Sequence, residues 1–209
     1  MITEFAYQFM KAIAKSVTYS DKWAGLVVPM KKMVNKSEKI IPVAINSNFI
    51  TNSSDYIDLI PNSSRMSIIY CERLGLTTTL SESRNYSIMA TRMRIVVWYN
   101  CNLMNAGDWI DEGIVATNFV NGIPRRFPNT DLTYIKNVAI FNPIIVHNED
   151  IFAKYTYDEV RTQYTTFPYG SFAVDVELQY THVKCAETII PAPSCAAPYV
   201  GTECTPNPA

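Results

Sequence analysis

The sequence of 209 residues predicts an α+β fold: a mostly antiparallel sheet flanked by two or three helices, with an extended C-terminal tail. Along Phe172–Tyr180 large apolar residues occupy every second position, which is typical of a half-buried antiparallel strand. Strand-like segments outnumber helical ones, and most connections are too short for parallel crossovers. From Cys185 onward the alternation stops. We therefore expect an α+β domain over residues 1–184 and an extended tail with prolines and cysteines over 185–209.

The first part of the chain predicts a helix followed by a hairpin. Residues 3–19 place apolar side chains at helical spacing, which gives one apolar stripe. Leu26–Val34 and Lys39–Asn46 read as two strands joined by a short polar linker. Pro29 and Pro42 lie within them, and because proline cannot donate to a sheet ladder, we expect these strands at an edge or interrupted.

The middle of the chain predicts further strands. Met66–Glu72 is a short strand, whereas Leu76–Asn85 fits a strand or a loop. Tyr86–Cys101 is the longest strand-like segment and exceeds the usual strand length, so we expect it to bend, bulge or project. On this strand Arg92 and Arg94 share one face.

The last part alternates helices and strands. Trp109–Val120 predicts a helix with Asp108 as its candidate cap. A strand within Leu132–Val146 follows, then a second amphipathic helix over Glu149–Tyr164. The strand Phe172–Tyr180 completes the domain.

Composition excludes several classes of protein. The formal net charge is −1 and no long run of Lys or Arg occurs, which argues against free nucleic-acid binding. No apolar run approaches the roughly 20 residues of a membrane span, and the N-terminus does not resemble a signal peptide. Charged residues make up 18%, below the usual quarter; a partner covering part of the surface and simple compositional drift both explain this.

The cysteines predict neither a disulfide framework nor a metal site. Their number is five, and an odd number without a signal peptide argues against paired disulfides. Cys71 and Cys101 lie in strand-like segments and read as core residues. The three in the tail are ten and nine residues apart, too far for the paired ligands of a zinc site. We expect no metal and no cofactor.

No catalytic constellation is present, so we expect no enzyme. Nucleophile and phosphate-loop motifs are missing, and the sequence contains only two histidines, His147 and His182. An acid–base site at His147 and Glu149 is the enzyme alternative, against a surface loop. A monomeric adaptor or carbohydrate-binding module is a third hypothesis, which needs an exposed patch built from the thirteen tyrosines.

Interaction residues are easier to nominate. A proline-flanked loop contains two arginines and a phenylalanine, residue types enriched at interfaces. The tail has apolar residues that suggest extended docking on a neighbouring subunit, and a disordered terminus is the alternative. The candidate subunit-interface or channel residues are Arg92, Arg94, Arg125, Arg126, Phe127, Ile189, Ile190 and Tyr199.

Three features together resemble small neck and tail proteins of tailed bacteriophages. They are the opening amphipathic helix, the entry Trp23–Val27 into the hairpin, and the segment Arg92–Asn100. Within that group the chain is similar to ring-forming proteins of crAss-like phages, and more broadly to tail-terminator and tail-completion proteins. The resemblance is one of element order and covers the part before the tail; the Pro- and Cys-containing tail departs from tail terminators.

The resemblance implies a structural virion protein without an active site. Such a protein is assembled in the host cytoplasm as a homo-oligomeric ring, a dodecamer or a hexamer, that connects portal and tail. Its partners are the neighbouring portal, neck and tail proteins, and DNA passes through the lumen without sequence-specific binding. The near-neutral charge of the chain is consistent with such a channel.

Overall fold

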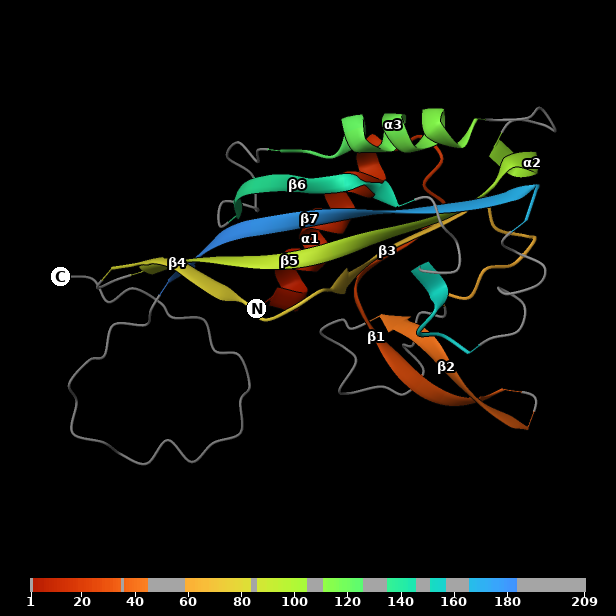
Figure 1. The fold of residues 1–209 in the computed structure, drawn as a ribbon, viewed down its shortest axis with the longest axis horizontal. Helices are drawn as coiled ribbons and strands as arrows, with labels where there is room; N and C mark the ends of the chain where they lie inside the picture. Colours follow the sequence, from red (N-terminus) through yellow and green to blue (C-terminus); the bar gives the residue numbers. More distant parts are fainter. Residues whose placement is uncertain are drawn as a thin grey trace, which may run out of the picture.

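One seven-stranded sheet and three helices make up the described part of the chain (Figure 1). The computed structural model describes residues 2–34, 36–44, 59–83, 86–104, 111–125, 135–145, 151–156 and 166–183. In chain order the elements are α1 (Ile2–Ser16), β1 (Lys22–Val34), β2 (Ser37–Ala44), β3 (Ser67–Arg73), β4 (Thr78–Glu82), β5 (Tyr86–Asn100), α2 (Cys101–Met104), α3 (Glu112–Gly122), β6 (Ile135–Ile145) and β7 (Tyr169–Val183). The predicted α+β class is confirmed.

The strand order is β2-β1-β3-β5-β7-β6, with β4 paired to β5 outside this path. Every described pairing is antiparallel except that of β1 with β3. β5 pairs with β7 along its whole length, from Tyr86 opposite Val183 to Asn100 opposite Tyr169. On its other edge β5 pairs first with β4 and then with β3. The long predicted strand therefore projects beyond β3, and β4 accompanies the projecting part.

Helices α1 and α3 cover one face of the sheet. Phe9, Met10 and Ile13 of α1 are fully buried against it. The alternating apolar residues of β7 point toward this face and are at most 3% exposed, which confirms the predicted inward face: Phe172, Val174, Val176, Leu178 and Tyr180. Phe119 of α3 meets Phe172 edge to face with ring centroids 5.4 Å apart. This apolar layer is the main core.

The opposite face has a smaller apolar cluster at the β1–β3 side. Its largest members are Trp98 and Tyr70, which pack with residues of the 151–156 segment. Pro29 lies opposite Pro42, where β1 has already passed the end of its pairing with β3, and β2 is the edge strand of the sheet. The predicted edge position of these prolines is confirmed, since neither amide is needed for a ladder there.

Two helix predictions are wrong in detail. Asp111, not Asp108, caps α3: its carboxylate accepts hydrogen bonds from the amides of Gly113 (2.7 Å) and Ile114 (3.3 Å), and the helix begins at Glu112 rather than Trp109. The predicted helix Glu149–Tyr164 is interrupted: among its described residues, 151–154 form one turn, and Tyr155 and Thr156 are not helical.

The reason lies in the pairing of that segment with β2. The amide of Thr156 donates to the Ile40 carbonyl (3.0 Å), and the Ile40 amide donates to Thr156 Oγ1 (2.7 Å). These bonds to a distant strand compete with the helical hydrogen bonds that Thr156 would otherwise make. The short helix α2 was not predicted, and the segment Leu76–Asn85, which fits strand or loop, contains strand β4.

Candidate interaction surface

A row of charged side chains crosses the sheet on the face opposite α1 and α3. Glu72 of β3 lies opposite Arg94 of β5, which in turn lies opposite Asp175 of β7. Two residues earlier on β5, Arg92 lies opposite Glu177. Because side chains alternate between faces along a strand, all five point to the same side, and we call them the polar strip. Sequence alternation placed Arg92 and Arg94 on one face, and the structure confirms this.

The two arginines of the polar strip differ in how firmly they are held. Arg94 makes a bidentate pair with Asp175, with Nε–Oδ1 at 2.7 Å and Nη2–Oδ2 at 3.0 Å, and only 22% of its side chain is exposed. Arg92 lies 3.8 Å from Glu177 and is 69% exposed. A short, half-buried bidentate pair is a strong interaction, whereas a long exposed pair contributes little. Both arginines nonetheless have an acid on β7 beside them.

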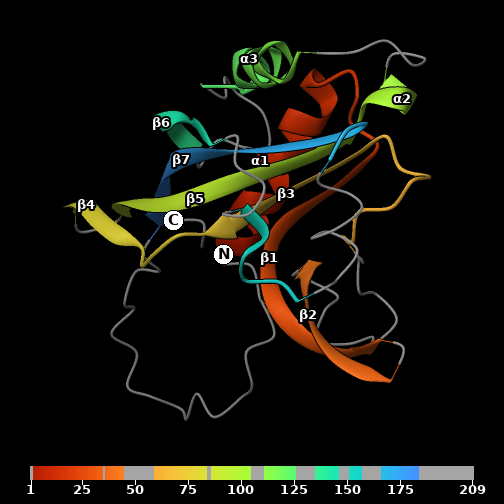
Figure 2. The same cartoon turned by 45° about the vertical axis from the view of Figure 1, so that its right-hand side comes forward.

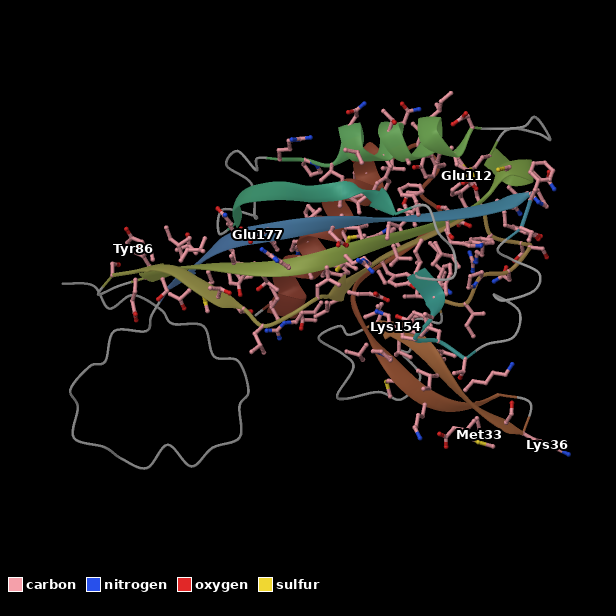
Figure 3. All side chains as sticks on the ribbon, in the orientation of Figure 1. Met33, Lys36, Tyr86, Glu112, Lys154 and Glu177 are labelled. Atoms are coloured by element: carbon pink, nitrogen blue, oxygen red, sulfur yellow. The ribbon has the colours of Figure 1, made fainter. Side chains whose placement is uncertain are left out.

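Glu72 ties the polar strip to the 151–156 segment. Tyr155 donates its phenolic hydrogen to one carboxylate oxygen of Glu72, and Lys154 donates from Nζ to the other. Glu72 is 3% exposed and Tyr155 2% exposed, so the carboxylate is satisfied by these two donors in the interior. Figure 3 shows Lys154 on its turn and Glu177 on β7. The sequence analysis did not predict this contact. The one feature that could have indicated it is an acidic residue, Glu72, at the end of the apolar run of β3.

Exposed apolar side chains gather around β4 and the N-terminal end of β5. Of the eight large exposed ones among the described residues, four lie between β3 and the start of β5: Leu74 (41% exposed), Leu76 (87%), Leu80 (51%) and Tyr86 (45%). A fifth, Met33 (65%), lies near the tip of the β1–β2 hairpin, where Lys36 adopts φ 66°. Both views place this tip and β4 at separate ends of the sheet (Figure 2). The chain thus has two projecting β arms: the β1–β2 hairpin, and β4 with the start of β5.

The remaining nominated residues are placed unevenly. Arg125 follows α3 and is exposed. Arg126, Phe127, Ile189, Ile190 and Tyr199 lie outside the described residues, as do His147 and Glu149, so these predictions stay predictions. Cys71 and Cys101 are buried, as expected of core residues. Burial raises the pKa of the Cys71 thiol.

Other kinds of site find little support in the described part of the chain. No group of three or more His, Cys, Asp or Glu side chains is placed there to hold a metal ion. None of the described helices has the length and apolar character needed to cross a bilayer. Tyr86 is the one exposed tyrosine among those described, so these tyrosines form no aromatic patch of the kind that carbohydrate binding requires.

No protein-family model matches this chain. No curated protein matches it significantly either.

Proposed function

We propose that this chain is a structural subunit of a homo-oligomeric ring in the neck or tail of a tailed phage. The ring connects portal and tail, and DNA passes through its lumen without sequence-specific binding. The observation that carries the proposal is the pair of β arms at separate ends of one sheet. Contacts between two different surfaces of identical copies generate a closed ring when the rotation between copies closes.

The charge distribution supports a contact of this head-to-tail kind. The β1–β2 hairpin, Lys22–Ala44, contains five lysines and one glutamate, although the whole chain has a net charge of −1. The rest of the chain is therefore net acidic. A basic arm on one copy is attracted to the acidic body of the next, which favours a heterologous contact over a self-complementary one.

The polar strip supports the passage of DNA. Arg94 and Arg92 lie beside Asp175 and Glu177, and Glu72 is held by Lys154. An arginine held in a short, half-buried bidentate pair, as Arg94 is, is less available to phosphates than a solvated one. A surface of this kind, turned to a lumen, lets the duplex slide.

Light scattering after size exclusion tests the proposal. Twelve copies of a 23.7 kDa chain give about 280 kDa, and six give about 140 kDa. Met33→Asp at the hairpin tip should reduce the mass to that of the single chain while leaving the circular dichroism unchanged. Leu103→Asp is the matched control: Leu103 is 48% exposed on α2, outside both arms, and its variant should keep the ring. A monomer at every concentration up to the solubility limit overturns autonomous ring formation.

A further inference from the structure

Strand β4 has one edge that no described strand covers. Its five residues, Thr78–Glu82, are all exposed, and within the described ranges it pairs with β5 alone. In both views β4 lies at the end of the sheet away from α3, with no helix over it (Figures 1 and 2). An edge strand of this kind is a template for pairing with another extended segment.

The apolar side chains around this edge make it a docking surface. Leu76 is 87% exposed and Leu80 51% exposed, with Leu74 and Tyr86 nearby in sequence. Natural proteins protect such an edge with charges, with proline, with a bulge, by keeping the strand short or by covering it. β4 is short, and its pairing with β5 is irregular between Thr79 and Ser81. Thr78–Glu82 contains a single charge and no proline. The exposed leucines around this edge favour covering by another segment.

The C-terminal segment begins at this same end of the sheet. β7 ends at Val183, which lies opposite Tyr86. The turn between β4 and β5 closes there, with the Ser83 amide donating to the Tyr86 carbonyl at 2.8 Å. Residues 184–209 follow Val183, and the first large apolar residues among them are Ile189 and Ile190.

We propose that Thr188–Ile190 of the chain's own C-terminal segment adds to the uncovered edge of β4 as a short antiparallel strand. The three residues are β-branched, which favours a strand, and Pro191 ends it because proline has no amide to donate. β4 and β7 both run toward this end of the sheet, since each is antiparallel to β5. A chain that turns back after Val183 therefore runs antiparallel to β4.

The connection is long enough. The added strand lies three strand spacings from β7, or about 14 Å. From Val183 to Thr188 the extended chain spans up to about 17 Å. A tether this short gives the segment an effective concentration of about millimolar or more, so it outcompetes the same segment of other copies in dilute solution. This inference goes beyond the ring and does not depend on it.

Hydrogen–deuterium exchange with mass spectrometry tests the proposal on the full chain. Amides of β4 should exchange about tenfold slower in the full chain than in the chain ended at Val183. The double variant Ile189→Asp/Ile190→Asp should lose this protection, and it keeps β7 intact should the truncated chain fold poorly. Tyr199→Asp/Val200→Asp is the matched control, since it changes an apolar pair further along the same tail and should keep the protection.

Two results overturn the proposal. One is equal exchange of β4 in the full chain and in the Ile189/Ile190 double variant. The other is protection that falls on tenfold dilution, which assigns the edge to a second copy. Light scattering on the same samples separates this from the ring: protection in a monomeric sample supports a segment docked on its own chain without a ring.

Discussion

The hydroxyl of Tyr155 offers a clean perturbation of the contact that anchors the 151–156 segment. It donates to the carboxylate of Glu72, and both side chains are almost completely buried. Tyr155→Phe removes this one donor and keeps the aromatic ring in the apolar cluster. The lost free energy therefore reports the hydrogen bond with little contribution from packing.

The expected cost is about 2 kcal/mol. A hydrogen bond to a charged group contributes about 1.5–3 kcal/mol, and the cost is incurred here because one carboxylate oxygen of Glu72 loses its donor in the interior. Lys154 still donates to the other oxygen, which keeps the loss below that of an unpaired buried charge. Against a total stability of about 5–15 kcal/mol, the change is large enough to measure.

Urea unfolding at pH 7 and 25 °C measures this cost, and a second tyrosine provides the control. Tyr99 is fully buried, and its hydroxyl has no hydrogen-bond partner among the described residues. Tyr99→Phe removes the same group without breaking a bond, so we expect it to lie within about 1 kcal/mol of the unmodified chain. If Tyr155→Phe costs under about 0.5 kcal/mol, or Tyr99→Phe costs as much as Tyr155→Phe, the reasoning fails.

Three further predictions follow from the same structure. Arg94→Ala should cost about 2 kcal/mol in urea unfolding because its bidentate bond to β7 is half-buried, while Arg92→Ala should cost under about 0.5 kcal/mol; equal costs would contradict the geometry. Gly25→Ala should cost about 2 kcal/mol, since a Cβ there would lie 2.9 Å from the backbone of α1, whereas Gly75→Ala meets nothing within 4 Å and should be neutral. Cys71, whose pKa burial raises, should resist iodoacetamide at pH 8 until the chain unfolds; peptide mass spectrometry that finds it alkylated in the folded protein would refute its burial.

Local patterns were sufficient for the strands of the core. In β7 every second residue is large and apolar, so the inward face from Phe172 to Tyr180 follows from the two-residue period alone. The same period placed Arg92 and Arg94 together. β4 lacked such a signal because both of its faces are exposed; it is a strand because it pairs with the projecting part of β5.

The partners within the polar strip depend on contacts between distant residues. Arg94 meets Asp175, 81 residues away, only through the register of β5 on β7. Glu72 meets Tyr155 across 83 residues, where the sequence pattern favoured a helix. The cap of α3 was ambiguous for a local reason, because Asp108 and Asp111 both precede the helix and aspartate caps equally well at either position.

An electron micrograph of the purified protein distinguishes a ring from a single subunit. If the chain forms the proposed ring, we expect end-on class averages that show a closed ring with a central hole, at about 280 kDa for twelve copies or about 140 kDa for six. Compact particles of a single 23.7 kDa chain without a hole, at every concentration imaged, would contradict it.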